Sequence, residues 1–473
     1  MTQKYPLWFV KALRIGIAAI LVIAPFYITL AVWSASLLHH LDLFKIWKEL
    51  ALAIMALIIA IFLFTQRGLA KRSLKSRLIE LSVVYVSLIL LIGVFDMLTH
   101  RVSRNAVIYG LLTDLRPIGF FLVAYLTFVI SAQKKLPAMN WKKIILIPAL
   151  LVIIFGFLQM TVLPKDILKH VGYSNATTAP YQTVDNQPNI VRVQSTTRGP
   201  NPLGAYDLVI ITALSVLLVK AKGRRQLWLG VFLAISLVML FGTYSRSAEI
   251  GVLLAWLTLI AIYQKKWLAK HIFISIGAIV IVALIGVLAA ERHNYFLQNI
   301  FLHTSNRSTS AVSSNAQRGQ AIKSAISDVY HHPLGGGIGS AGPASRRNTK
   351  GPLKLAEDNY LQIGQEAGVI GMILFIAIIV VAGIELWRRR QDQLALILLA
   401  SLVGLSFVNL VSHAWTDDTL AYIWWGLAGI ALAPALVESV PLNRPALSGH
   451  STGPAILSGR HKQQNGQKIK TAP

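Results

Sequence analysis

Apolar runs of about 20 residues recur along most of this 473-residue chain. A run of that length matches what an α-helix needs to cross the hydrocarbon core of a membrane. Because backbone amide and carbonyl groups cannot stay unpaired in lipid, each run should form a helix. Hydrophobic residues make up 55% of the chain and charged residues 14%, a balance that a soluble protein could not carry on its surface. The pattern predicts an all-α, polytopic transmembrane helical bundle.

We expect about twelve spans, each near the length that crosses a bilayer. They lie at about 12–34, 47–65, 78–98, 108–131, 143–163, 203–221, 226–243, 247–264, 271–289, 359–387, 393–413 and 420–438. The fourth is interrupted by Asp114, Arg116 and Pro117. The chain leads from Met1 straight into the first apolar run with no small-residue cleavage site, which indicates an uncleaved first span.

Lysine and arginine gather in alternate loops between these spans. If the N-terminus is inside, the cytoplasmic loops are all densely basic, whereas the short outward loops are poor in basic residues. The basic loops are 66–77, 132–143, 220–226, 264–271 and 387–393. The alternation accounts for most of the net charge of +26, so the charge indicates contact with anionic membrane lipids and not with nucleic acid.

The domain organisation follows from the same reading. A transmembrane domain is expected over residues 1–440, with two long extracytoplasmic loops at about 164–202 and 290–358. Residues 441–473 are rich in Pro, Gly, Ser, Gln and Lys, which is typical of a disordered cytoplasmic tail. The absence of cysteine excludes disulfides, thiolate metal sites and a cysteine nucleophile.

Arginines in the outward segments need a separate explanation, because long outward loops escape the positive-inside bias. Arg198 stands just before the sixth span, in a turn that Gly199, Pro200 and Pro202 make rigid. Such a turn can hold a guanidinium at the membrane surface, where its planar fork would bind a lipid diphosphate. The alternative is an interfacial arginine that reaches lipid headgroups.

A second arginine lies at the corner between the seventh and eighth spans. Arg246 and Glu249 are three residues apart and can pair on one helix face. A charge so close to the hydrocarbon is usually paired or functional. Arg116 and Asp114, in the interrupted fourth span, are open to two readings: they line the same outward cavity, or they only pair with each other.

The large second loop contains a short helix and a glycine-rich turn. The helix is expected over 317–330, with Ile322, Ile326 and Val329 on one stripe and Arg318 near its start. The following glycine-rich turn, 331–345, can offer backbone N–H groups to phosphate oxygens, or can be a plain structural turn. It lacks the Lys-Ser/Thr of a P-loop.

Two acidic residues stand at the start of the tenth span, at the outer membrane surface. Glu357 and Asp358 precede Asn359 and Gln362. A carboxylate here could accept a proton from an attacking sugar hydroxyl; it could equally cap the helix N-terminus. His331 and His332 are adjacent, and no carboxylate–histidine spacing resembles a metal centre, so we expect no metal and no cofactor.

Four segments in this order resemble the O-antigen ligase superfamily, which also contains polysaccharide polymerases and protein O-oligosaccharyltransferases. They are RGPNPLG at 198–204, TYSRSA at 243–248, the loop from Gln317 to Gly339, and EDNYLQIGQEAGVIG at 357–371. The resemblance covers about residues 190–375. Its last block departs from the family pattern: Glu357 stands where the ligases carry histidine, and Asp358 where asparagine is usual. The similar spelling HNYFLQ at 293–298 precedes the large loop and is set aside.

The resemblance implies a GT-C-like membrane glycosyltransferase of lipopolysaccharide or other envelope polysaccharide biosynthesis. It places the chain in the bacterial inner membrane with its active site facing outward. The implied donor is an undecaprenyl-diphosphate-linked glycan, and the acceptor a glycan or lipid hydroxyl. Transfer would be a metal-independent, inverting step.

Carried over residue by residue, the resemblance gives each candidate a role. Arg198, Arg246 and Arg318 would hold the diphosphate, and Glu357 would be the general base. The remaining substrate-binding candidates are Arg116, Asp358, Asn359 and Gln362.

Two other functions stay open. A repeat-unit polymerase would use the same chemistry with another lipid-linked repeat unit as the acceptor. A transporter or flippase for lipid-linked glycans would also fit twelve spans, although transporters usually show two related halves and ionisable residues near the bilayer midplane. A structural membrane protein is disfavoured by the clustered outward arginines.

Overall fold

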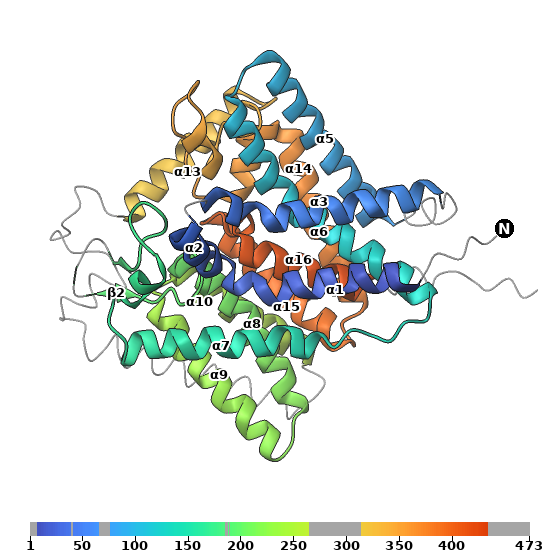
Figure 1. The fold of residues 1–473 in the computed structure, drawn as a ribbon, viewed down its shortest axis with the longest axis vertical. Helices are drawn as coiled ribbons and strands as arrows, with labels where there is room; N and C mark the ends of the chain where they lie inside the picture. Colours follow the sequence, from blue (N-terminus) through green and yellow to red (C-terminus); the bar gives the residue numbers. More distant parts are fainter. Residues whose placement is uncertain are drawn as a thin grey trace, which may run out of the picture.

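The structure, a computed structural model, describes residues 7–38, 41–65, 76–184, 188, 190–263 and 314–433. Within these residues it is a helical bundle with one short antiparallel pair of strands (Figure 1). The elements are α1 (Leu7–Ile23), η1 (Ala24–Phe26), α2 (Tyr27–Leu38), α3 (Leu41–Thr65), α5 (Arg77–Thr99), α6 (Arg104–Gln133), α7 (Trp141–Thr161), η2 (Ile167–Val171), β1 (Gln182–Thr183), β2 (Val191–Arg192), α8 (Pro200–Lys220), α9 (Arg224–Gly242), α10 (Arg246–Tyr263), α13 (Ser314–His331), η4 (Gly342–Arg347), α14 (Asn359–Arg388), α15 (Gln393–Leu410), η5 (Ala414–Thr416) and α16 (Asp418–Leu432).

Ten helical segments of the described chain are long and apolar enough to cross a membrane, so the protein is a multi-pass membrane protein. They are Leu7–Leu38, Leu43–Thr65, Arg77–Thr99, Arg104–Gln133, Trp141–Thr161, Pro200–Lys220, Arg224–Gly242, Arg246–Tyr263, Asn359–Arg388 and Gln393–Leu410. The predicted helical bundle is confirmed to this extent.

Two of the twelve predicted spans are not among these ten segments. The predicted span 271–289 lies outside the described residues, together with the segment 293–298 and the tail 441–473. The predicted span 420–438 begins at Asp418 as α16, and its described part ends at 433.

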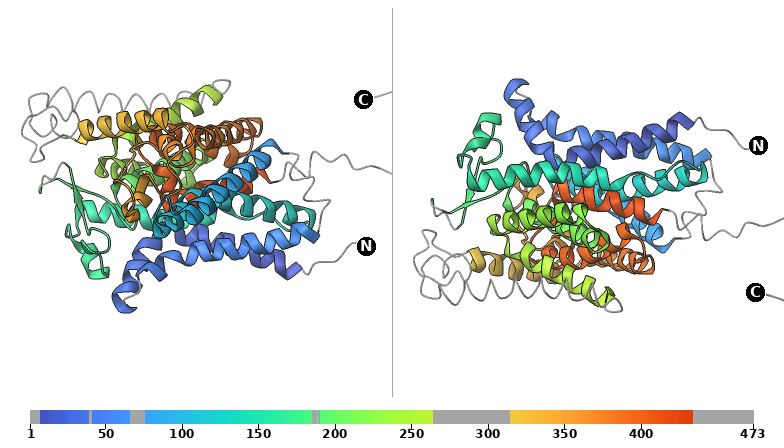
Figure 2. Two further views of the ribbon diagram at one scale, coloured as in Figure 1. Left: turned by 90° about the horizontal axis from the view of Figure 1, so that it is seen from above. Right: turned by 90° about the horizontal axis from the view of Figure 1, so that it is seen from below.

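Different parts of the chain lie at the two ends of the bundle. In Figure 1 and in the left view of Figure 2, β2 and the start of α13 lie at the left, opposite the start of α1 at the right. The left end is therefore the end that the charge pattern of the loops assigns to the outside.

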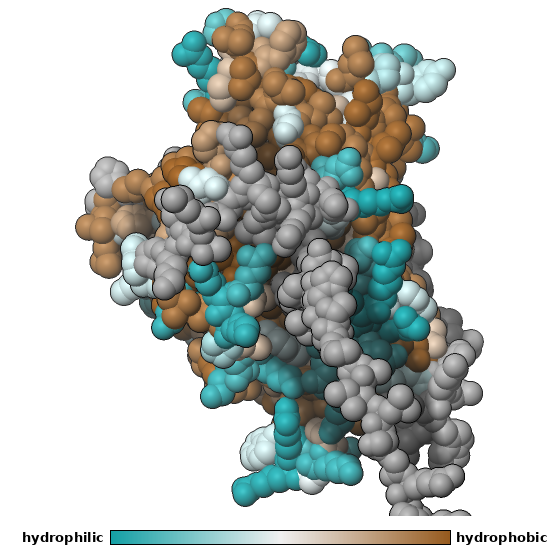
Figure 3. Space-filling model, turned by 90° about the vertical axis from the view of Figure 1, so that its right-hand side faces the viewer, coloured by the Kyte–Doolittle hydropathy of each residue, from teal (hydrophilic) through white to brown (hydrophobic). Residues whose placement is uncertain are grey.

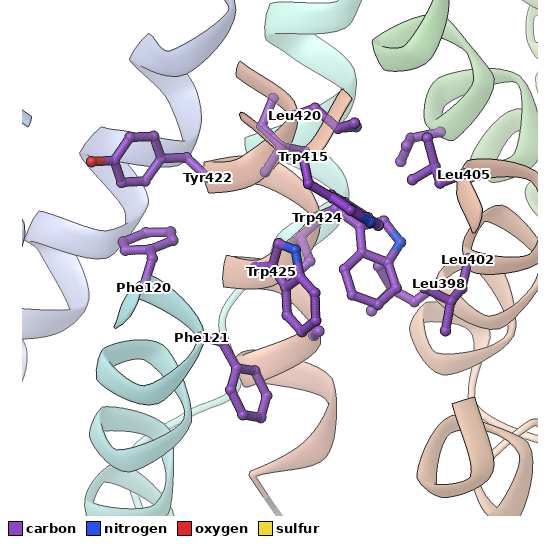
Figure 4. Packing of buried hydrophobic residues seen from close by; sticks show 14 of the residues in the cluster. Phe120, Phe121, Leu398, Leu402, Leu405, Trp415, Leu420, Tyr422, Trp424 and Trp425 are labelled. Carbon is purple, nitrogen blue, oxygen red and sulfur yellow. The ribbon is translucent and has the colours of Figure 1, made fainter. Parts of the chain in front are cut away.

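Helices α6 and α16 pack against each other at the centre of the bundle. The ring of Phe120 on α6 meets the ring of Tyr422 on α16 edge-on, with centroids 5.0 Å apart. Close approach depends on Gly429, where a Cβ would lie 2.8 Å from the Phe121 carbonyl oxygen. The aromatic cluster is completed by Trp415, Trp424 and Trp425, all at most 1% exposed (Figure 4). This packing fixes the N-terminus of α16 beside α6.

Large hydrophobic side chains cover much of the outside of the bundle. Leu57 and Phe64 on α3 and Leu98 on α5 are each more than 60% exposed. Figure 3, which looks at the right-hand side of Figure 1, shows such side chains over the upper part of this face, and hydrophilic side chains nearer its middle and lower edge. Exposed apolar surface of this extent suits contact with lipid.

The glycine-rich turn is built into a break in α14. Gly368 has a φ of 73°, and the neighbouring Val369 N–H donates to the Pro333 carbonyl oxygen at 2.9 Å. Gly337, with a φ of 101°, passes so close to Asp96 of α5 that a Cβ would lie 2.7 Å from its carboxylate oxygens. Glycine is required here by both backbone conformation and space.

The amides of this turn bind carboxylates of the protein. The Ile338 N–H donates to Asp96 at 2.8 Å, and the Gly339 N–H donates to Glu366 of α14 at 3.0 Å. Both carboxylates are buried. The sequence-based alternative that these amides cradle a phosphate is therefore wrong, and the turn is a structural anchor between α5 and α14.

Helix α13 contains the short helix predicted at 317–330. Its buried face consists of Ala325 and Val329, which are 1% and 8% exposed, and the helix packs against α14. Ile326, predicted on the same stripe as Val329, is 54% exposed. The register of the buried stripe thus differs from the prediction by about one residue, because α14 meets the helix from the Ala325 side.

The first outward loop packs on α2 and η1. The Tyr173 hydroxyl lies 2.9 Å from the Thr29 hydroxyl, and the Thr196 hydroxyl donates to the Pro25 carbonyl oxygen at 2.9 Å. These contacts fix the chain immediately before Arg198, so the turn that begins α8 stands beside η1 and the first turn of α2.

Candidate functional site

A cavity of about 630 Å³ opens among α2, α3, α6, the turn before α8 and the N-terminus of α16. Five basic residues and two acidic residues line it, so its walls carry an excess of positive charge. The charged lining residues are Lys45, Lys48, Glu49, Arg116, Arg198, Arg347 and Asp418. Two of the predicted site residues, Arg116 and Arg198, therefore share one cavity.

Arg116 is held by a buried ionic network at the base of this cavity. Its guanidinium donates to Glu49 from Nη2 at 2.7 Å and from Nε at 3.0 Å, and it also pairs with Asp418. Lys48 completes the network, with its Nζ 2.9 Å from Asp418 and 3.2 Å from Glu49. Two cations and two anions balance, as a buried network requires.

The predicted pairing of Arg116 with Asp114 does not occur. Asp114 instead hydrogen-bonds to Glu366 of α14, on another side of α6. A helix turns by about 100° per residue, so side chains two positions apart point in different directions. The other alternative, that both residues line the cavity, is correct for Arg116 alone, which has Glu49 and Asp418 as its partners.

Arg198 projects into the cavity without a partner of its own. Its side chain is exposed, and within the described part of the chain no hydrogen bond or ion pair involves its guanidinium. The rigid turn from Gly199 onward starts α8 directly behind it, with Pro200 in the first turn. Toward the described residues, the five N–H donors of this guanidinium are thus unused.

Arg318 and Glu357 form an ion pair beside this cavity. Nε of Arg318 lies 3.5 Å from Oε2 of Glu357, and each side chain is 32% exposed. The pair joins the first turns of α13 to the residue before the cap of α14. Neither residue lines the cavity, but both act electrostatically on His413, as does Arg198. The charges of the three residues with predicted catalytic roles therefore all influence one histidine.

His413 follows α15 and was not singled out in the sequence. It is half-buried, and its Nδ1 lies 3.2 Å from the carbonyl oxygen of Ala356, the residue just before Glu357. Burial lowers the pKa of His413, the Glu357 carboxylate opposes this shift, and the Arg198 charge adds to it. The imidazole is therefore neutral at pH 7.

Asp358 is the N-cap of α14. Its Oδ1 accepts the Leu361 N–H at 2.8 Å, which is the structural alternative considered for this acidic pair. Burial raises the pKa of Asp358, and the N–H groups of Leu361 and Tyr360 oppose this shift. Of the two acidic residues, only Glu357 keeps its carboxylate away from the helix terminus.

Asn359 and Gln362 are buried behind this cap. They are 2% and 0% exposed, and among the described residues the Asn359 Oδ1 and both amide atoms of Gln362 have no hydrogen-bond partner. The Gln362 amide lies against Gly342 of η4. Neither residue lines the cavity, so a binding role for them stays a prediction.

Arg246 lies at the start of α10, next to the N-terminal turn of α8. Glu249 interacts electrostatically first with Arg246 and then with Arg192. Arg192 in turn donates to Asn201 at 2.5 Å and to the Thr243 carbonyl oxygen at 2.9 Å. This second cluster braces the α9–α10 corner against α8, and Arg246 is not part of the cavity wall.

Metal-ligating side chains do not converge in the described chain: no three His, Asp or Glu side chains lie together there as a metal ion would need. The positive charge that could meet a phosphate comes from arginine and lysine side chains.

Sequence reasoning missed four residues of this region: Lys48, Glu49, His413 and Asp418. Lys48 and Glu49 had a signal, since they are adjacent charges inside a predicted span, where charges are usually paired or functional. His413 and Asp418 stand in a loop counted only for its lack of basic residues. Nothing in the sequence indicated that this loop closes against Ala356 and Arg116.

Comparison with known families adds one match. Residues 229–376 match the family described as O-antigen ligase, which confirms the resemblance over that range. The matched range begins in α9, ends in α14 and contains Arg246, Arg318 and Glu357. Arg198 and His413 lie outside it. No curated protein matches the chain.

Proposed function

We propose that this multi-pass membrane protein, which carries an O-antigen ligase domain over residues 229–376, transfers a glycan from undecaprenyl diphosphate to an acceptor hydroxyl on the outer face of the bacterial inner membrane. The proposed architecture is GT-C-like: a helical membrane domain with its site at the outward end. The observation that carries the proposal is the guanidinium of Arg198, which has no hydrogen-bond or ion-pair partner among the described residues, in a cavity with excess positive charge.

The cavity suits a lipid diphosphate in charge. Within its network, Lys48 and Arg116 are balanced by Glu49 and Asp418, so the remaining excess comes from Lys45, Arg198 and Arg347. A diphosphate diester carries two negative charges, and the planar fork of an arginine can donate two hydrogen bonds to its oxygens.

The arginines contribute to the rate by stabilising the leaving group. As the bond between the anomeric carbon and the diphosphate oxygen breaks, negative charge grows on that oxygen, and a fixed cation lowers the barrier. We assign this role to Arg198, which lines the cavity, with Arg116 fixing the base of the cavity and Arg246 bracing the adjacent corner. Arg318, which does not line the cavity, orients Glu357 through their ion pair. Guanidinium groups thereby do what Mg²⁺ does in other enzymes, so the proposed transfer needs no metal.

Glu357 supplies the basic group of the proposed reaction. The acceptor hydroxyl loses a proton as its oxygen attacks the anomeric carbon in one inverting step. The negative charge of the Glu357 carboxylate stabilises the positive charge of that proton. The ion pair with Arg318, 3.5 Å from Nε to Oε2, fixes the position of this carboxylate. A ligase and a repeat-unit polymerase would share these steps and differ only in the acceptor.

The test is transfer from a purified undecaprenyl-diphosphate glycan to candidate acceptors in detergent, with EDTA present. We expect product with the wild-type protein and a decrease of about 10²–10³-fold in turnover for Arg198→Ala, the size of effect seen when one charge-stabilising donor is removed. Lys169→Ala is the matched control, because Lys169 is a cation of the same outward loop that is exposed and pairs only locally with Asp166.

The transporter reading is tested in the same preparation. Movement of lipid-linked glycan across vesicles, with no product from any acceptor, would refute glycosyl transfer and favour a flippase. Equal turnover of wild type and Arg198→Ala would refute the assignment of the cavity.

A further inference from the structure

His413 joins the three predicted catalytic residues from an element that carried no prediction. It lies between α15 and η5, whereas Glu357 precedes α14, Arg318 belongs to α13 and Arg198 precedes α8. All three act electrostatically on its ring. Four separate segments of the chain therefore bring their functional groups to one place at the outward end of the bundle.

The hydrogen bond of His413 fixes which ring nitrogen is basic. A carbonyl oxygen only accepts hydrogen bonds, so Nδ1, at 3.2 Å from the Ala356 oxygen, must carry the hydrogen. In the neutral ring, Nε2 then holds the lone pair.

The charges around the ring suit a proton acceptor. Glu357 stabilises an imidazolium, whereas Arg198 and Arg318 oppose it, and burial also opposes it. Asp417 and Asp418, which follow η5, add negative charge near Arg198. The ring is thus neutral before reaction, with one carboxylate ready to stabilise the charge that it would gain.

We propose that His413 is the proton acceptor of the transfer reaction and that the acceptor hydroxyl binds on its side of Arg198, opposite the diphosphate cavity. The inference rests on the proposed function and refines it, since it assigns the proton to Nε2 of His413 and gives Glu357 the stabilisation of the imidazolium. In this arrangement Arg198 lies between the acceptor site beside His413 and the diphosphate cavity. The hydroxyl and the diphosphate can therefore reach the same anomeric carbon.

The step balances as follows in atoms and charge. The hydroxyl oxygen forms a bond to the anomeric carbon while its proton moves to Nε2. The bond from that carbon to the diphosphate oxygen breaks, and its electron pair leaves with undecaprenyl diphosphate, held by Arg198. The imidazolium returns its proton to solvent before the next turnover.

The first experiment compares His413→Asn with His413→Gln. Asparagine keeps a donor close to the position of Nδ1 and can retain the bond to Ala356, but it has no base at the position of Nε2. We expect both variants to melt near the wild-type temperature and to lose about 10²–10⁴-fold in turnover, the usual contribution of a general base. Wild-type turnover in His413→Asn would overturn the proposal and leave His413 as a loop anchor.

The second experiment is the pH dependence of kcat/KM. The wild type should lose activity as pH falls and His413 is protonated, and Asp417→Asn should keep this acidic limb. Asp417 is the control because its charge also acts on Arg198 and burial raises its pKa to about 6. His413→Asn should lose it. An acidic limb that disappears in Asp417→Asn and persists in His413→Asn would also overturn the proposal.

These outcomes are separable from those of the proposed function. If the wild type transfers glycan and Arg198→Ala does not, the function stands whatever His413 does. A third variant, His413→Ala, covers loss of fold in the others: added imidazole should restore part of its turnover, and a failure to restore any in a folded variant counts against a base at this position.

Discussion

Nε of Arg318 lies 3.5 Å from Oε2 of Glu357, and this ion pair joins α13, a helix outside the membrane spans, to the start of the spanning helix α14. Both side chains are about one-third exposed. Ion pairs with that exposure contribute little to stability, about 0–1 kcal/mol. Loss of the pair should therefore change folding stability little, so an effect on the reaction can be separated from an effect on folding.

Glu357→Gln should separate these two roles. The amide keeps the shape of the side chain but has no negative charge to stabilise the transferred proton. Turnover should therefore fall by about 10²–10⁴-fold. The melting temperature and the affinity for the donor should change little. Glycan transfer, thermal melting and binding of a labelled donor would be measured side by side; retained turnover would remove Glu357 from the reaction.

Substitution of Arg116 should lower the stability of the protein, whereas substitution of Arg198 should not. Arg116→Met removes one cation from the buried network and leaves Glu49 and Asp418 with Lys48 alone. Breaking such a network costs about 3–5 kcal/mol, because a buried charge loses its partner. Arg198→Met removes a side chain without such contacts among the described residues and should leave the melting temperature unchanged. Equal melting of the two variants would contradict this division.

Gly337→Ala should displace the glycine-rich turn. The new Cβ would lie 2.7 Å from the Asp96 carboxylate, at a φ of 101° that alanine rarely adopts. We expect a loss of about 1–3 kcal/mol from the strained backbone alone.

Gly319→Ala is the matched control. Gly319 lies inside α13 with open space around it, so alanine should stabilise that helix by about 0.5–1 kcal/mol. Melting in detergent would measure both variants, and a tolerated Gly337→Ala would show that the turn can move away from α5.

Asp417 should make stability depend on pH. Burial raises the pKa of Asp417 to about 6, the Asp418 charge adds to this and Arg198 opposes it. Its folded pKa lies above the value of about 4 in an unfolded chain. The folded state therefore binds more protons between these values, and stability falls as pH rises from about 4 through about 6.

Asp417→Asn removes this dependence and keeps an N-cap for α16, since asparagine caps as well as aspartate. The variant should melt higher than the wild type at pH 7.5, and the difference should shrink at pH 5. His413 changes stability with the opposite sign, because burial lowers its pKa; comparing the two proteins at each pH cancels that contribution. If the difference in melting temperature grew as pH falls, the raised pKa of Asp417 would be contradicted.

The sequence by itself determined that this is a helical membrane protein. Lipid leaves a spanning chain almost no choice but a helix, so the length of each apolar run is enough to locate a span. Ten of the predicted spans recur in the described structure. The spacing of the motifs also indicated the family that the match over residues 229–376 supports. These are local properties, readable from neighbouring residues.

Only the tertiary structure decided which charges meet. Arg116 pairs with Glu49 and Asp418, not with the nearby Asp114, and His413 reaches Ala356 from the far end of α15. A helix points successive side chains in different directions, so partners depend on which helices pack together and at what rotation. That arrangement is fixed by contacts such as Gly429 against α6. It places Arg116 in a buried ionic network, whereas Arg198 lines the same cavity without a hydrogen bond or ion pair among the described residues.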